Sequence, residues 1–213
     1  MSHDDHGDHD HSDGDPIAKR NALRAEALES LLVERGLVRP ALIDAIVARY
    51  EQDIGPLNGA KVVARAWSDD SFRQRLLSEA WTAIAELDLP IGAESTPIVV
   101  VENSPNVHHV VVCTLCSCYP SSLLGLPPTW YKSPQYRSRV VREPRAVLHE
   151  MGLDLPADVE VRVWDSSAEI RYMVLPERPQ GTEGWTEEQL RTLVTRDSLI
   201  GVANAKSRDK GDG

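Results

Sequence analysis

The chain has 213 residues, enough for one or two domains, which excludes a small scaffold that depends on disulfides. Hydrophobic residues make up 41% and charged residues 26%, and 23 Lys and Arg against 33 Asp and Glu leave a formal net charge of −10. So acidic a chain is poorly suited to neutralising phosphates, so we expect no nucleic-acid partner. No apolar run approaches the roughly 20 residues of a membrane helix, and the polar N-terminus does not resemble a secretory signal, so we expect no membrane association.

The cysteines indicate a compartment and a kind of chemistry. All three lie within the six residues from Cys113 to Cys118. A secreted disulfide framework would instead spread an even number of cysteines through the chain. The cluster favours a reducing compartment and metal or redox chemistry, and we expect a cytoplasmic location.

The chain begins with a polar tail. Residues 3–15 hold four His and six Asp with almost nothing to bury, so we expect residues 1–17 to be disordered. His-rich tracts collect divalent ions, and delivery of metal to a deeper site is one interpretation. We favour the alternative of a merely solubilising tail, because flexible imidazoles bind metal weakly. A second disordered tail is predicted over residues 206–213.

Helical periodicity dominates residues 18–90. The first helix ends at Gly36 and carries leucines and alanines at helical spacing, namely Leu23, Ala27, Leu28, Leu31 and Leu32. A second helix is predicted from Pro40, with a buried stripe of Leu42, Ile43, Ile46, Val47 and Tyr50. A third helix is predicted near 58–67, and a fourth runs from Ser68, as N-cap, to Ile84. We expect these helices to form an arm around a partner chain.

After Pro90 the pattern predicts strands. β-branched runs predict strands over 97–102 and 107–112, and further strands are predicted over 159–165 and 170–175. A helix is predicted over 133–151, reset near Pro144, and a last helix begins at Thr186 with a capping box. Helices before and after strands, without strict alternation, predict an α+β fold: a helical arm, then a layered α/β/β/α domain over residues 91–205.

The cysteine motif follows the second strand directly. It precedes a loop in which regular structure is excluded by Pro120, Gly125, Pro127 and Pro128. A C-x-x-C overlaps a C-x-C on this strand-to-loop bend, so all three sulfurs can turn toward one point. The motif therefore predicts a metal or redox site.

Three interpretations of this site remain open from the residues alone. A tetrahedral zinc site would take His108 or His109 as its fourth ligand. A thioredoxin-like pair would need a helix after the cysteines, whereas prolines follow here. The third interpretation adds the backbone amides of Ser117 and Cys118, which requires a trivalent ion and leaves one octahedral position open for catalysis.

Longer stretches of the chain resemble a known family, the alpha subunit of nitrile hydratase. The resemblance extends over about residues 20–203 and rests on Cys113-Thr-Leu-Cys-Ser-Cys-Tyr119 and on the segments 125–131, 136–145, 164–167 and 184–185. Thr114 and Tyr119 resemble the cobalt-type pattern more than the iron type. The resemblance implies a hydro-lyase that converts a nitrile to an amide at a low-spin, non-corrin Co(III).

The same resemblance implies how the site is built. Sulfur ligands come from Cys113, Cys116 and Cys118, and backbone nitrogen ligands from Ser117 and Cys118. Cys116 is oxidised to a sulfinic acid and Cys118 to a sulfenic acid, and Cys118 and Ser117 are the catalytic residues. The nucleophile is either a metal-activated water or the sulfenate oxygen, and the sequence favours neither.

The resemblance also implies partners. The family builds its pocket between subunits, so we expect a beta subunit, as one chain or as two, that supplies arginines to the oxidised cysteines. We also expect a metal-loading activator and a small-molecule nitrile as substrate. Rival hypotheses are the cobalt subunit of a thiocyanate hydrolase and a non-catalytic zinc or cobalt carrier. The least favoured alternative is a cluster of three buried cysteines without a metal, because closely packed thiols gain little stability from burial and are prone to oxidation.

Two positions depart from the family pattern. The family commonly has Trp where this chain has Ser121, and often has Gln where this chain has Glu94. Loss of the Trp predicts a roomier pocket for a bulky nitrile. The alternative is that a partner chain fills the gap.

Charged and imidazole side chains near the motif have two interpretations each. A basic run is either a solvated helix face or a set of cations for the sulfur cluster or a partner's carboxylates; it comprises Lys132, Arg137, Arg139, Arg142 and Arg145. His108 and His109 precede the motif on a strand, where alternation predicts one inward and one outward side chain. We favour a hydrogen-bonding role in the core over a ligand role.

Overall fold

The computed structural model describes residues 16–48, 56–89, 96–116 and 118–207. Most of the tails expected at 1–17 and 206–213 lies outside these residues, as do Tyr50, Glu94 and Ser117. Residues 16 and 17 were expected to be disordered but begin the first helix. The chain divides into two compact units, residues 1–47 and residues 48–213. Within the described residues, no helix has both the length and the apolar character needed to span a bilayer.

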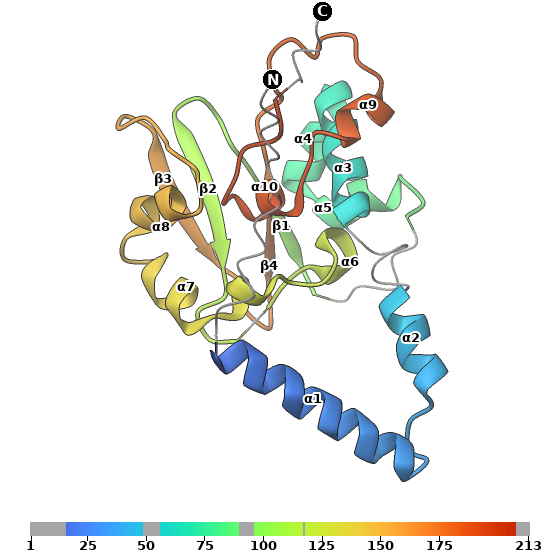
Figure 1. Cartoon of the computed structure of the whole chain (residues 1–213). Coiled ribbons are helices and arrows are strands. Elements are labelled where there is room, and N and C mark those ends of the chain that lie inside the picture. Colours follow the sequence, from blue (N-terminus) through green and yellow to red (C-terminus); the bar gives the residue numbers. More distant parts are fainter. Residues whose placement is uncertain (1–15, 49–55, 90–95, 117, 208–213) are drawn as a thin grey trace, which may run out of the picture. The chain divides into compact units, whose positions relative to one another are not determined.

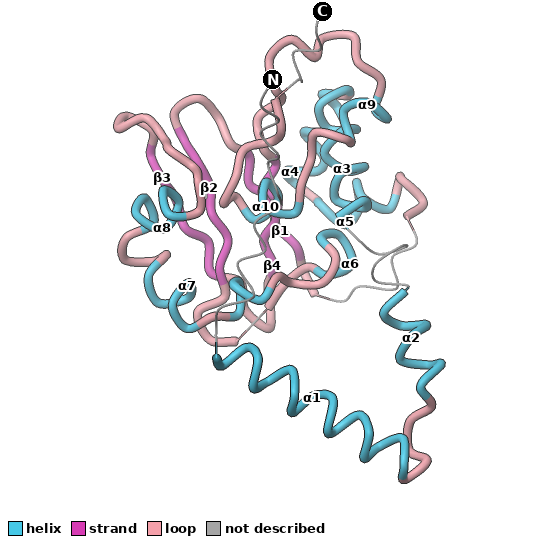
Figure 2. The backbone as a smooth tube through the Cα atoms, viewed as in Figure 1, coloured by secondary structure: helices cyan, strands magenta, loops and turns pink. Residues whose placement is uncertain are grey.

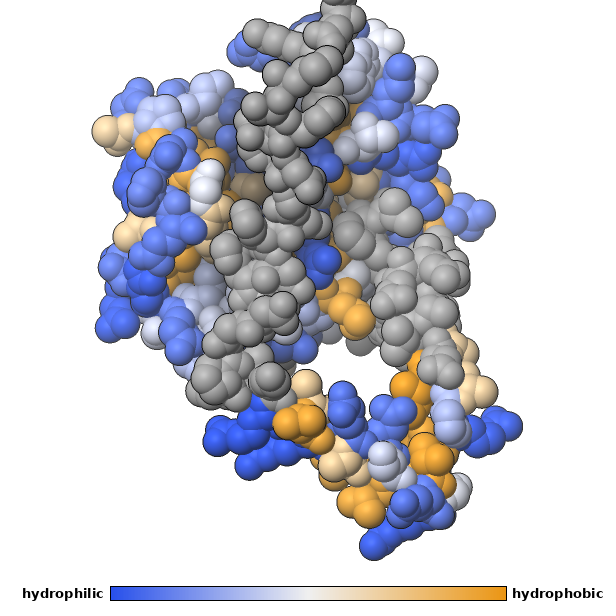
Figure 3. All heavy atoms as spheres, viewed as in Figure 1, coloured by the Kyte–Doolittle hydropathy of each residue, from blue (hydrophilic) through white to orange (hydrophobic). Residues whose placement is uncertain are grey.

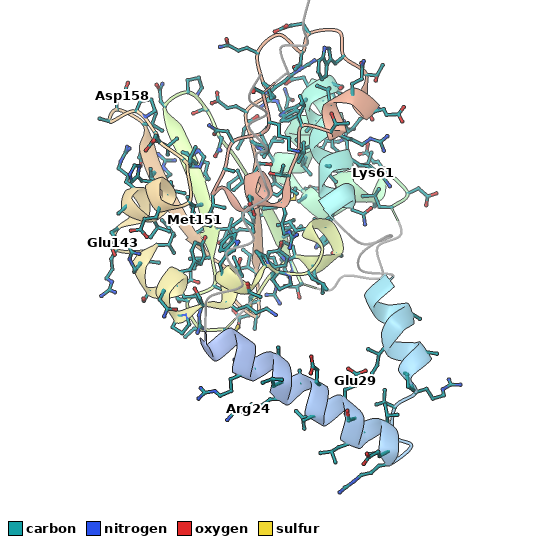
Figure 4. All side chains as sticks on the ribbon, in the orientation of Figure 1. Arg24, Glu29, Lys61, Glu143, Met151 and Asp158 are labelled. Atoms are coloured by element: carbon teal, nitrogen blue, oxygen red, sulfur yellow. The ribbon has the colours of Figure 1, made fainter. Side chains whose placement is uncertain are left out.

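The first unit consists of helices α1 (Pro16–Glu34) and α2 (Pro40–Ala48), where the sequence predicts them. Gly36 lies between them with a left-handed φ of 64°, a conformation that glycine adopts without strain. Several leucines remain exposed, as Figure 3 shows for the apolar side chains of these helices: Leu23, Leu28, Leu31, Leu32, Leu37 and Leu42. The predicted burial of Leu42 is therefore wrong within this unit. Arg24 and Glu29 project from α1 (Figure 4).

The second unit begins with α3 (Pro56–Ser68), α4 (Asp70–Ser78) and α5 (Ala80–Ala85). These helices share one hydrophobic core with the strands, to which they contribute Val62, Val63, Phe72, Leu76 and Ile84. The arm that the sequence predicts over residues 18–90 therefore includes helices that here belong to the core unit. The predicted N-cap at Ser68 is wrong, because the side chain of Asp69 accepts the hydrogen bond from the Phe72 amide at 3.0 Å. A break at Glu79 divides the predicted fourth helix in two.

Four strands form two parallel pairs, and all four were predicted from the sequence. They are β1 (Ile98–Glu102), β2 (Val107–Val112), β3 (Glu160–Asp165) and β4 (Arg171–Leu175). β1 pairs with β4 and β2 pairs with β3 (Figures 1 and 2). The register of the second pair places Val112 beside Asp165. Parallel partners need a long crossover between them, so β3 is far from β2 in sequence and adjacent in space.

Helices cover the strands, which gives the α+β fold that the sequence predicts. α4 and α5 contact β1, α10 (Arg196–Ile200) contacts β4 and β2, and α8 (Pro144–Glu150) contacts β3 (Figure 1). α7 (Pro134–Arg139) precedes α8, and the interruption between them lies just before Pro144, as predicted. α9 (Glu187–Arg191) begins with the predicted capping box of Thr186 and Gln189.

Two short helices were not predicted. α6 (Ser121–Leu124) lies in the segment where prolines were expected to exclude regular structure. Pro120 stands before the first turn, where the missing N–H costs nothing, and Gly125 ends the helix with a φ of 76°. α10 was missed although Thr195 and Ser198 repeat the spacing of a capping box. A single 3-10 turn, η3 (Thr129–Lys132), connects α6 to α7.

Gly201 makes a very close backbone contact with β2. Its φ is 88°, and a Cβ at this position would lie 1.9 Å from the carbonyl oxygen of His109. The turn after α10 cannot move away from β2 without opening the core. The glycine is therefore required both by its conformation and by the space available.

We expect Gly201→Ala to destabilise the protein by at least about 4 kcal/mol, because strain and clash combine. Gly152→Ala is the matched control: its φ is 87°, but nothing lies within 4 Å of an added Cβ. It should cost only the backbone strain, roughly 1–2 kcal/mol. Urea unfolding of both variants measures the difference. Equal losses would show that the contact with His109 is not what constrains Gly201.

Candidate metal centre

The three cysteine sulfurs converge on one point directly after β2. All three Sγ atoms lie within 4.8 Å of one another. The Cys113 and Cys116 sulfurs are 3.4 Å apart, and the Cys116 and Cys118 sulfurs are 3.1 Å apart. None of the three cysteines forms a disulfide; Cys113 and Cys118 are buried and Cys116 is exposed. Among the described residues this is the one group of His, Cys, Asp and Glu side chains spaced to hold a metal ion.

The N-terminal half of the loop is held by the end of β3. The carboxylate of Asp165 accepts one hydrogen bond from the Thr114 amide at 2.9 Å and another from the Thr114 hydroxyl at 2.6 Å. The Cys116 amide also donates to the Cys113 sulfur at 3.3 Å. These bonds turn the chain back on itself immediately after Cys113. The tight bend expected from the sequence is therefore stabilised by a residue that the sequence analysis did not single out.

The C-terminal half of the loop is held by an aromatic cluster. The phenol of Tyr131 donates to the Cys118 carbonyl oxygen at 3.0 Å. The Tyr131 ring packs edge-on against Tyr119, with ring centroids 5.1 Å apart, and also against Trp130 and Tyr136. Burial raises the pKa of the Tyr131 phenol well above its usual range, so the phenol remains a hydrogen-bond donor.

The chemistry of these donors fits a transition metal. Burial raises the pKa of the Cys118 thiol to about 12, with further increases from Cys116 and Cys113 and a decrease from the Arg171 guanidinium. Without a cation the Cys118 thiol therefore keeps its proton, and a bound cation would displace it. A metal–sulfur distance of about 2.3 Å is compatible with neighbouring sulfurs this close together. Three thiolates favour a soft or borderline transition metal over Mg²⁺ or Ca²⁺.

Both histidines before the loop are buried, so the prediction that one faces outward is wrong. Helices and loops cover both sides of β2. His108 accepts from the Asn103 side-chain amide at 3.1 Å and donates to the Gly201 carbonyl oxygen at 2.7 Å. His109 accepts from the Trp164 indole at 2.7 Å. Burial lowers the pKa of both imidazoles. Their nitrogens bond to neighbours in the core, which agrees with the role that we favoured over a ligand role.

The basic run divides between surface and site. Arg139 pairs with Glu143 and Glu150; Glu143 lies in the turn between α7 and α8 (Figure 4). Arg145 donates to backbone carbonyl oxygens before β3. Arg137 differs, because it donates to the Cys116 carbonyl oxygen at 3.2 Å. Arg137 of the basic run therefore contacts the metal loop, which is the cysteine loop of residues 113–118. Ser117, the remaining predicted site residue, lies outside the described residues.

Known proteins are similar to this chain in sequence and in fold. Residues 19–203 match the family described as nitrile hydratase, alpha chain. A high-molecular weight cobalt-containing nitrile hydratase subunit alpha of Rhodococcus rhodochrous is 58% identical over 183 residues, which cover 85% of this chain and 90% of that protein. A thiocyanate hydrolase subunit gamma of Thiobacillus thioparus is 43% identical over 190 residues, with 84% and 78% covered.

A solved structure agrees with these relatives. A double mutant of the Fe-type nitrile hydratase from Comamonas testosteroni Ni1 superimposes with a TM-score of 0.81 at 43% sequence identity, and the match covers 93% of this chain and 97% of that one. The likeness therefore extends through nearly the whole chain and includes the cysteine loop.

We expect Asp165→Ala to lower metal affinity by roughly 10-fold to 100-fold, because residues that orient metal ligands commonly have effects of this size. Asp154→Ala is the control, since Asp154 is exposed and bonds to His149 away from the loop. Metal content after dialysis against graded chelator measures the affinity. An unchanged metal content in Asp165→Ala would contradict the role of the Thr114 contact.

Proposed function

Because the chain belongs to the nitrile hydratase alpha-chain family, we propose that its cysteine loop carries a catalytic Co(III) centre that hydrates a nitrile to the corresponding amide. The convergence of the three sulfurs carries this proposal. Cobalt is favoured over iron because the relative with 58% identity is named as cobalt-containing, and because Thr114 and Tyr119 follow the cobalt-type pattern. The Fe-type structure shares the fold at lower identity.

The chain's residues would hold the metal from one side. Sulfur would come from Cys113, Cys116 and Cys118, and backbone nitrogen from Ser117 and Cys118. When bound, a trivalent ion acts as a Lewis acid that withdraws charge from the nitrile carbon. Oxidation of Cys116 to the sulfinate and of Cys118 to the sulfenate is part of the proposal. Cys118 and Ser117 are the proposed catalytic residues.

The geometry of the loop supports a partner. Cys116 is exposed, and Leu115 beside it is 85% exposed, so an apolar side chain at the loop is available to a partner. We propose that a beta subunit, as one chain or as two, covers this face and completes the pocket. The exposed leucines of α1 and α2 fit an arm that also packs on a partner. A cytoplasmic location would keep the thiols reduced until an activator loads the metal.

Two alternative functions can be distinguished from nitrile hydration by experiment. A thiocyanate hydrolase subunit would share the loop, and the named gamma subunit is 43% identical to this chain. The cobalt-containing nitrile hydratase relatives, at 54–58% identity, favour nitrile hydration instead. A zinc or cobalt carrier would use the same sulfurs without turnover.

The test uses the complex produced together with its beta subunit. We expect stoichiometric cobalt, amide release from nitriles, and three added oxygen atoms in the peptide that contains Cys116 and Cys118. Metal analysis, product assay and peptide mass measure these. Carbonyl sulfide release from thiocyanate would indicate the hydrolase, and unmodified thiols with zinc would indicate the carrier.

We expect the substrate preference to depend on Ser121, which is the first residue of α6 and is partly exposed just after the loop. Ser121→Trp should raise KM for a bulky aromatic nitrile roughly tenfold and leave KM for a small aliphatic nitrile nearly unchanged, because the larger ring occupies pocket volume. Ser122→Ala is the control, since Ser122 is buried. A wild-type complex that strongly prefers small aliphatic nitriles would contradict the roomier pocket.

A further inference from the structure

Tyr131 is a fully buried side chain that contacts the metal loop from 13 residues downstream. Its relative exposure is 0%, and its phenol donates to the Cys118 carbonyl oxygen at 3.0 Å. It lies in η3, directly after Pro127 and Pro128. The prolines restrict the backbone before the turn, so the tyrosine is presented to the loop from a stiff segment.

The phenol has little freedom to turn away from Cys118. Three aromatic rings surround it, with centroid distances of 5.1 Å to Tyr119, 5.8 Å to Tyr136 and 6.1 Å to Trp130. The neighbouring side chain of Ser166 lowers the pKa of the phenol, against the larger increase caused by burial. The Ser166 amide in turn donates to the Val112 carbonyl oxygen at 2.7 Å. Ser166 is therefore held at the end of β2, close to the phenol that bonds to the cysteine loop.

Cys118 has two proposed donor atoms that must be positioned, whereas each of the other cysteines has one. In the proposed function it supplies both a sulfur and a backbone nitrogen, and both atoms are linked through one Cα. A hydrogen bond to its carbonyl oxygen restricts rotation about the Cα–C bond, and so helps to hold the backbone from which both donor atoms are placed. We propose that Tyr131 is a positioning residue of the cobalt centre, and that it acts by holding the Cys118 carbonyl. The inference rests on the proposed function and adds a residue from outside the cysteine motif.

Tyr136 provides a matched control within the same aromatic cluster. Its phenol is also buried and donates to a backbone carbonyl, that of Val111, at 2.8 Å. Val111 lies within β2, which strand pairing holds in place. Tyr131→Phe and Tyr136→Phe therefore each remove one buried phenol-to-carbonyl hydrogen bond, but only the first bond belongs to the metal loop.

The experiment compares the two variants in the complete cobalt-loaded complex. We expect both to lower the midpoint of thermal unfolding by similar amounts. Only Tyr131→Phe should shift the sulfur-to-cobalt charge-transfer absorption and reduce the oxygen count at Cys116 and Cys118. It should also lower kcat about tenfold with KM nearly unchanged, as expected for a residue that orients a metal ligand. Ser166→Ala should shift the absorption in the same direction by a smaller amount.

An unchanged absorption in Tyr131→Phe, or an equal shift in Tyr136→Phe, would overturn the inference. If Tyr131→Phe does not assemble, Ser166→Ala decides, and an unchanged absorption there also overturns it. These outcomes are distinct from failure of the proposed function. If the proposed function fails, the wild-type complex itself would lack cobalt, charge-transfer absorption and amide formation.

Discussion

The site depends on a short backbone segment that must bend sharply and stay bent. Three sulfurs lie within 4.8 Å of one another without a disulfide between them, so the polypeptide itself holds them together before a cation does. Asp165 holds one half of the loop through Thr114, and Tyr131 holds the other through Cys118. Both anchors are neutral or anionic groups that bond the backbone and leave the sulfurs available. The loop is therefore preorganised for a metal by hydrogen bonds made outside the ligand set.

The parallel pairing of β2 with β3 places one of these anchors. Its register puts Asp165 beside Val112, one residue before Cys113, and the carboxylate then reaches the Thr114 amide and hydroxyl. The crossover between the two strands contains α6, η3, α7 and α8, so the same connection also delivers Tyr131 and Arg137 to the loop. One topological feature thus supplies contacts to both halves of the cysteine motif.

Burial divides the site into a fixed face and an open face. Cys113 and Cys118 are buried against the core, whereas Cys116 and Leu115 are exposed. The Cys118 thiol keeps its proton until a cation displaces it, so metal loading and release of that proton would be a single event. The exposed side gives a partner access to the centre. In the proposed function, this division would let one chain hold the ion while another chain completes the pocket.

The sequence by itself determined the four strands, the capping box at Thr186, the α+β class and the convergence of the cysteines, because each depends on local periodicity or on spacing within a few residues. It did not predict the roles of Asp165 and Tyr131, which lie 51 and 13 residues from their partners Thr114 and Cys118. Nor did it predict the burial of both histidines, because alternation along a strand does not show whether other elements cover both faces of that strand. Contacts between distant segments arise from packing and strand register, and only the tertiary structure decided them.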